Sequence, residues 1–142
     1  MNKNQLIAIF FGIAACSWMP HWACHYYRIE TGSSFIVGNL HFSILDSLLS
    51  MLLYSILICL NLIAISYTKV RFIAALTSGI FHLTLGIVHI VRFINPFPFE
   101  VFGLEWSMGS SLREIIIVLP FGIWCIAMAM KVNKMPKGAS YY

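Results

Sequence analysis

Residues 48–94 read LLSMLLYSILICLNLIAISYTKVRFIAALTSGIFHLTLGIVHIVRFI, two long apolar runs joined by the five residues YTKVR at 67–71. Each run is long enough to cross a hydrocarbon core of about 30 Å as a helix. A connection this short requires the second run to turn back beside the first, so the stretch predicts a hairpin of two transmembrane helices. Asn95, Pro96 and Pro98 end the second helix, because proline lacks a backbone donor and disfavours helix at the preceding residue.

Two further apolar stretches flank this hairpin. The first has no Asp, Glu, Lys or Arg between Lys3 and Arg28, and the last begins at Ser111 with Glu114 three residues on, which is a capping-box signature. The expected spans are residues 6–27, 41–67, 72–94 and 112–130. Period-2 alternation is missing, and lipid requires satisfied backbone hydrogen bonds, so helices are favoured over a barrel. We find no internal repeat and expect one all-α domain over residues 1–142, with four antiparallel transmembrane helices.

The composition supports a membrane protein. Of 142 residues, 60% are hydrophobic and 10% are charged, and the mean hydropathy is +0.85. Soluble domains have roughly 45–50% apolar and 25% charged residues. Four spans use most of the chain, so a separate soluble catalytic domain is excluded.

The charges predict an orientation. Four crossings place the N-terminus, the connection at 67–71 and the C-terminus on the same side of the membrane. Six basic residues lie on that side: Lys3, Lys69, Arg71, Lys131, Lys134 and Lys137. Arg28, Arg92, Arg113 and all five acids fall at the opposite ends, which gives +6 on one side and −2 on the other, in agreement with the net charge of +4. The positive-inside rule then places both termini in the cytoplasm, in a plasma or inner membrane. The basic pI follows from this topology, so we expect the lipid bilayer, other membrane subunits or a second copy as partners, and no nucleic acid.

The N-terminus allows a second interpretation. Lys3, an apolar run and the sequence IAAC ending at Cys16 loosely imitate a secretory signal with a lipid-modified cysteine. We prefer an uncut anchor, because hydrophobicity continues past Cys16 and cleavage would leave an odd number of spans.

Histidines gather in the predicted outer half. His21, Cys24 and His25 stand at i, i+3 and i+4 on one helix face, with Met19 nearby. Imidazole, thiolate and thioether together suit copper, or zinc if the thioether is not used. Ionisable groups inside spans usually face a bundle interior or a cavity, so the cluster is a candidate site. The competing interpretation is an interfacial belt of aromatic and histidine rings. The candidate metal ligands are His21, Cys24, His25, His41, Asp46, His82 and His89.

The third span carries its histidines beside small residues. Ala75, Gly79 and Gly86 share a face with His82 and His89, which predicts close approach of another helix. The two histidines are two turns apart, about 10.5 Å along the axis, so they cannot ligate one ion together. We expect each to pair across helices, His82 with Asp46, and His89 with His41 or His25. Asp46 itself lies below the predicted surface and needs a partner, a proton or a metal.

The segment 96–106, between the third and fourth spans, is too polar and proline-rich to span. We expect it to lie at the membrane interface as an aromatic lid, with Phe97, Phe99, Phe102 and Trp106 over a ligand. The turn from Arg28 to Ser34 is expected to be structural. Further candidates for lining a ligand site are Ser43, Tyr54, Arg92, Trp106, Arg113 and Glu114.

Known sequence motifs say little about the function of this protein. The sequence has no nucleotide-binding loop, hydrolase elbow, zinc-protease motif or C-x-x-C pair, and whether the protein is an enzyme stays open. The leading hypothesis is a small integral membrane protein whose extracytoplasmic, histidine-lined site binds a transition metal, copper before zinc, for redox chemistry or metal handling, alone or as a subunit of a complex. The alternatives are a lipid-, quinone- or haem-binding protein and a non-catalytic packing subunit.

Overall fold

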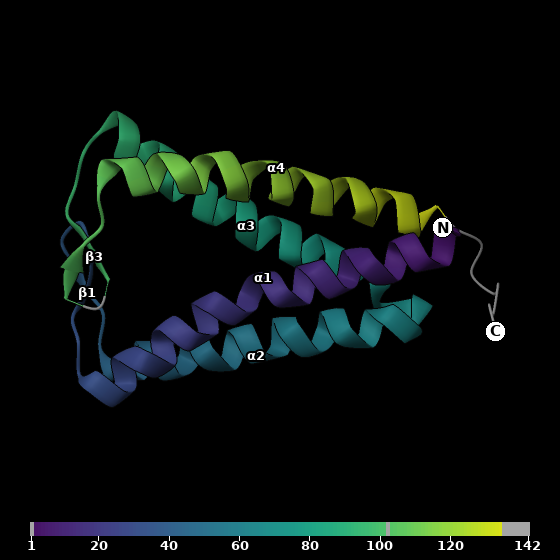
Figure 1. Cartoon of the computed structure of the whole chain (residues 1–142), viewed down its shortest axis with the longest axis horizontal. Helices are drawn as coiled ribbons and strands as arrows, with labels where there is room; N and C mark the ends of the chain where they lie inside the picture. Colours follow the sequence, from purple (N-terminus) through teal and green to yellow (C-terminus); the bar gives the residue numbers. More distant parts are fainter. Residues whose placement is uncertain (1, 102, 135–142) are drawn as a thin grey trace.

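The computed structural model describes residues 2–101 and 103–134, and four long helices dominate it (Figure 1). They are α1 (Lys3–Thr31), α2 (Ile44–Ser66), α3 (Arg71–Ile94) and α4 (Met108–Asn133). All four are long and apolar enough to cross a membrane. The chain is therefore a helical, multi-pass membrane protein, as its composition predicts. Phe102 and Lys137, which the sequence analysis uses, lie outside the described residues.

The two long connections form a small β-sheet at one end of the helices, here called the sheet end (Figure 1). Strands β1 (Phe35–Val37) and β2 (Leu40–His41) join α1 to α2, and β3 (Phe99–Val101) and β4 (Leu104–Glu105) join α3 to α4. The strand order is β2-β1-β3-β4, and β1 pairs with β3 in antiparallel register through Ile36 and Glu100. The segment at 96–106 was expected to lie at the membrane interface as a lid, without regular structure of its own. Its strands β3 and β4 instead form a hairpin that pairs with β1.

The chain is built from two helix–hairpin–helix units, so the expectation of no internal repeat is wrong. Phe99 follows Phe35 by 64 residues, and each strand of the second hairpin follows its counterpart by the same interval. Identical pairs at this spacing around the hairpins are His25 and His89, Arg28 and Arg92, Phe35 and Phe99, Val37 and Val101, Leu40 and Leu104, Ser43 and Ser107, Ser47 and Ser111, and Leu48 and Leu112. Elsewhere the two halves share little beyond apolar character, which any span has, and this hides the repeat.

The helix starts differ from the expected ones. Ser43 caps α2, and its hydroxyl and backbone form a capping box with Asp46. The second unit repeats this start at Ser107, whose side chain accepts from the backbone N–H of Ser110. The predicted capping box of Ser111 and Glu114 is therefore wrong, because α4 begins one turn earlier and both residues lie inside it.

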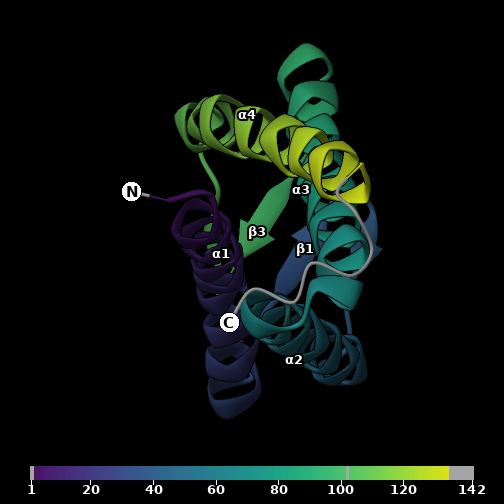
Figure 2. The same cartoon turned by 90° about the vertical axis from the view of Figure 1, so that its right-hand side faces the viewer.

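The opposite end of the helices, here called the core end, is closed by apolar side chains. The cluster consists of Ile7, Phe10, Phe11, Ala64, Ala74, Ala75, Cys125, Met128 and Ala129. Here α1 meets α4 through the Phe10 and Trp124 rings, whose centroids are 4.9 Å apart. Seen from this end, the strands lie behind the helices (Figure 2). The two units are thus joined at both ends, by side chains at one and by the sheet at the other.

Between those ends the helix pairs separate on one side. Helices α1 and α2 pack together, as do α3 and α4, and the short connection at 67–70 holds α2 beside α3. By contrast, no Cα atom of α1 lies within 8 Å of one in α4 over the described residues. The missing covalent link between the first and last helices leaves this side free to open.

Small residues bring α3 and α4 together, as the sequence predicts. A Cβ atom added at Gly79 would lie 2.6 Å from Ile126 Cδ1 and 3.1 Å from the Gly122 carbonyl oxygen. At Gly86 it would lie 2.3 Å from Leu119 Cδ2. Helices in lipid associate through such close van der Waals packing.

Replacing Gly79 by alanine should therefore loosen the α3–α4 pair. We expect Gly79→Ala to lower the free energy of unfolding by about 1–3 kcal/mol through overpacking. Thermal unfolding in mild detergent, followed by tryptophan fluorescence, measures this. Gly12→Ala is the matched control, because nothing lies within 4 Å of a Cβ there. Equal thermal unfolding midpoints for the two variants would show that the close contact of Gly79 with α4 does not contribute to stability.

Candidate functional site

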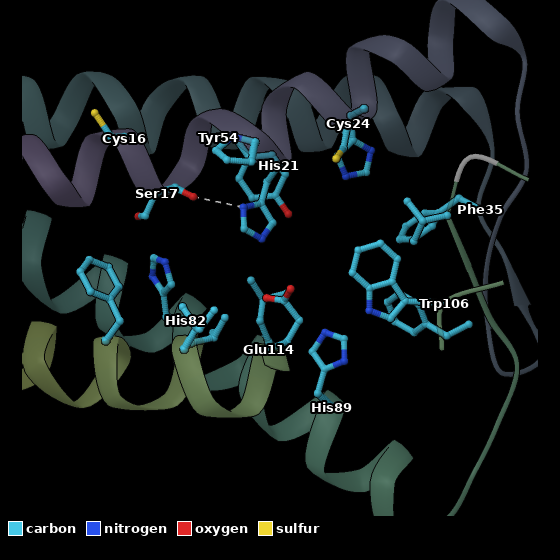
Figure 3. A pocket seen from close by; sticks show the side chains of 18 of the residues that line it. Cys16, Ser17, His21, Cys24, Phe35, Tyr54, His82, His89, Trp106 and Glu114 are labelled. Carbon is cyan, nitrogen blue, oxygen red and sulfur yellow. Dashed lines mark hydrogen bonds between the residues drawn. The ribbon is translucent and has the colours of Figure 1, made fainter. Parts of the chain in front are cut away.

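A cavity of about 760 Å³ lies between the two units, with the sheet at one end, and its lining extends toward the core end as far as Ile13 on α1 and Phe121 on α4. Side chains from α1, α2, α3, α4 and both hairpins line it (Figure 3). Four of its lining residues on α1 and α4 are exposed: Ile13, Cys16, Pro20 and Ile117. The cavity therefore has a side mouth between these two helices, where their backbones are apart.

Most of the predicted site residues line this cavity. They are His21, Cys24, His25, Tyr54, His82, His89, Trp106 and Glu114. The i, i+3, i+4 spacing of His21, Cys24 and His25 does place the three on one side of α1. Four of the five histidines thus line one cavity, and they come from two different helices.

Five predicted residues lie elsewhere. His41 is exposed on β2, and Ser43 and Asp46 form the cap of α2. Arg113 is exposed at 59% and contacts the outside of the Trp106 ring. Arg92 lies beneath the second hairpin. The expected pairs of His82 with Asp46 and of His89 with His41 are wrong, because a serine of the same or the neighbouring helix contacts each Nδ1 atom instead.

The ligand geometry does not support a metal centre. Within residues 2–101 and 103–134, no group of three His, Cys, Asp or Glu side chains is placed to hold a metal ion. The histidines are spread along the walls of a wide cavity, whereas copper or zinc needs three or four donors around one point. The residues present therefore do not fit the expected copper or zinc.

Two buried arginines fix the sheet end. Arg28, only 5% exposed, donates to the carbonyl oxygens of Ser33 at 3.0 Å, Ser43 at 2.8 Å and Phe42, and to Ser47 Oγ. Three of these bonds satisfy carbonyls of the connection that follows the arginine, and the fourth reaches a hydroxyl on α2, so Arg28 ties the end of one helix to the start of the next.

Arg92, 2% exposed, repeats every one of these bonds in the second unit. It donates to the oxygens of Phe97 at 3.0 Å, Ser107 at 3.3 Å and Trp106, and to Ser111 Oγ at 2.6 Å. Sequence reasoning treated Arg28 as part of a structural turn and missed this pair. The repeated spacing of His, Arg, Phe and Ser at 25–47 and 89–111 is the signal that would have found it.

The same serines contact a histidine in each unit. Ser47 Oγ lies 3.0 Å from His25 Nδ1, and Ser111 Oγ lies 3.2 Å from His89 Nδ1. Both imidazole rings thus have one nitrogen held against a helix, and both residues line the cavity.

Phe35 and Phe99 complete the cluster at the centre of the sheet. Their ring centroids are 6.3 Å apart, and each ring contacts the histidine of its own unit, at 5.7 Å for His25 and 5.3 Å for His89. Each also lies under the guanidinium of its own unit, at 5.8 and 5.4 Å. The result is a symmetric aromatic wall at the sheet end of the cavity.

The other two histidines are held in a different way. His21 Nδ1 lies 3.2 Å from the Ser17 carbonyl oxygen, and His82 Nδ1 lies 2.7 Å from that of Ser78. Because a carbonyl only accepts, Nδ1 carries the hydrogen in both rings and Nε2 is left as an acceptor. The Trp18 ring packs against His82, with centroids 4.0 Å apart and the ring planes tilted by 49°.

Glu114 is the acid of the cavity. Its carboxylate is directed into the space between His21 and His89 (Figure 3). Its ion-pair partner among the described residues is the neighbouring Arg113, at 3.4 Å. Beside His89, the buried Nε1 of Trp106 has no hydrogen-bond partner in the described part of the chain. The site thus offers donors and a carboxylate to whatever fills it.

Comparison with protein-family models, curated proteins and solved structures gives no match. The fold and the cavity by themselves define the class: a two-unit, four-helix membrane protein with an intramembrane pocket.

Removing Arg92 should destabilise the fold. Arg92→Ala leaves four oxygens at the sheet end without their donor, and a buried unpaired polar group costs about 1–3 kcal/mol. We expect the free energy of unfolding to fall by at least about 3 kcal/mol, measured by thermal or denaturant unfolding in detergent. Arg113→Ala, a change at an exposed arginine, should shift it by about 0.5 kcal/mol or less. Equal effects would show that the Arg92 bonds contribute no stability.

Proposed function

We propose that this chain spans a plasma or inner membrane with four antiparallel helices and cytoplasmic termini, and that its cavity binds a small amphipathic lipophile taken from the bilayer. The orientation is supported by the basic residues at the core end, such as Lys69 and Arg71, and by the acids at the sheet end, such as Glu100 and Glu105. On this arrangement the sheet and the histidines face the extracytoplasmic side.

The shape of the cavity is the observation that carries the proposal. Its volume lies within the roughly 300–1,000 Å³ typical of small-molecule sites. Apolar side chains such as Leu85, Val118 and Phe121 form much of its wall. Polar groups such as His25, His89 and Glu114 lie on the sheet side of Phe121, while His82 contacts the Phe121 ring. A ligand with an apolar body and one polar end matches this division.

The side mouth supports a path from the lipid. Ile13 and Ile117 are exposed at the mouth, and both are apolar. A lipophile could therefore pass from the hydrocarbon into the cavity without crossing water or a polar surface. The same mouth would be unsuitable for a hydrophilic solute.

A packing subunit needs no such space. Protein interiors are close-packed, and an empty cavity costs stability in proportion to its volume. Its retention, with histidine, tryptophan and carboxylate groups on the wall, favours a binding role over a purely structural one.

Filling the cavity should remove the ligand. We expect protein purified in mild detergent, without a polyhistidine tag, to release a lipophile on solvent extraction that mass spectrometry detects near one per chain. Val118→Trp places a large ring at a lining residue that is 6% exposed and should abolish this recovery.

Leu52→Trp is the matched control. Leu52 is 60% exposed on α2 and lies outside the cavity lining, so this variant should retain the ligand. Equal lipid recovery from folded wild type and Val118→Trp would sink the proposal.

A further inference from the structure

We infer that the polar end of the lipophile is a flat ring with hydrogen-bond acceptors on opposite edges, as in a quinone, and that it bridges His25 and His89. This inference rests on the proposed function, because it specifies the head group of the ligand in the same cavity. It follows from which hydrogen each side chain carries and from the symmetry of the two units.

The first step concerns His25. Arg28 donates to Ser47 Oγ, and arginine has donors only. The serine hydroxyl hydrogen is then free to be donated to His25 Nδ1, 3.0 Å away. This arrangement satisfies every group, and it makes Nδ1 an acceptor. The hydrogen of the neutral imidazole then lies on Nε2, away from the serine.

The second unit gives the same result. Arg92 donates to Ser111 Oγ at 2.6 Å, so the serine hydroxyl hydrogen is again available to His89 Nδ1, 3.2 Å away. His89 therefore also carries its hydrogen on Nε2. Both residues line the cavity, so each offers it a donor, in contrast to His21 and His82, whose Nε2 atoms are acceptors.

The two donors come from opposite units. Pairing of β1 with β3 makes Phe35 and Phe99 diagonal neighbours, with ring centroids 6.3 Å apart, and each ring contacts the histidine of its own unit. One ligand that satisfies both histidines must accept hydrogen bonds at two opposed positions. The two carbonyl oxygens of a para-quinone are placed in this way, and they only accept.

Further features of the site agree with this head group. The flat ring can lie against the Phe35 and Phe99 rings, in the offset or edge-on contacts that aromatic groups prefer. A fatty acid fits less well, because its charge is on one side and would meet the Glu114 carboxylate.

Binding of decylubiquinone tests the inference directly. Titration of the detergent-solubilised full chain, followed by tryptophan quenching, should show saturable binding. Decanol, with the same tail length and a single hydroxyl, should bind at least about tenfold more weakly, since it can satisfy one histidine donor at most.

Variants at the two histidines give the second readout. His25→Phe and His89→Phe should each weaken decylubiquinone binding by roughly 3- to 10-fold, the loss of one hydrogen bond, and by similar factors because the units are equivalent. His89→Gln, which keeps an N–H donor, should recover part of the loss. His41→Phe is the control, because His41 is exposed and outside the cavity.

The outcomes separate the two proposals. If decanol or an extracted lipid binds as well as decylubiquinone, or if folded His25→Phe and His89→Phe bind it like wild type, the quinone inference fails while the lipophile site stands. If the chain releases no lipophile and neither probe binds, both fail. Circular dichroism of each variant shows whether a loss of binding reflects unfolding.

Discussion

A guanidinium group away from water must have its donors satisfied, and this constraint organises the sheet end of the protein. Arg28 and Arg92 each bond three backbone carbonyls of the following connection and one serine hydroxyl. The cost of burying an isolated charge is high, so the connections cannot move away from their arginines. The hairpins are thereby held over the helix ends, β1 can meet β3, and the serines are left to orient the two histidines that face the cavity.

The two units are alike in sequence at this end, yet their surroundings differ, and the cavity arises from that difference. The chain passes from α2 to α3 through a single 3-10 turn, which holds that side closed. No segment joins α1 to α4, and their separation opens the mouth. The cavity wall also differs between the units: the residue 64 positions before Glu114 is Ser50, so the carboxylate has no counterpart in the first unit.

Some polar groups in this protein lie at the surface or cap a helix and others line the cavity, and the sequence does not distinguish the two roles. Asp46 and Glu114 are both acids near the start of a helix, but Asp46 caps α2 and Glu114 faces the cavity. The helix starts decide this: α4 begins at Ser107, so Glu114 lies two turns inside it. His41 and His89 show the same contrast, one exposed on a strand and the other buried beside Ser111.

The sequence by itself determined the four spans, the tight connection of α2 to α3, the small-residue contact of Gly79 and Gly86 with another helix, and the facing of His21, Cys24 and His25. These follow from hydropathy and helical spacing, which are local properties of the chain. Tertiary structure decided the sheet, the arginine anchors, the role of Asp46 and the absence of a three-ligand metal group among the described residues. Each of these depends on how helices are rotated and spaced against one another, and one stretch of sequence does not specify that. The hairpins are too short to show a strand pattern, and they exist because two distant segments pair only after the helices have brought them together.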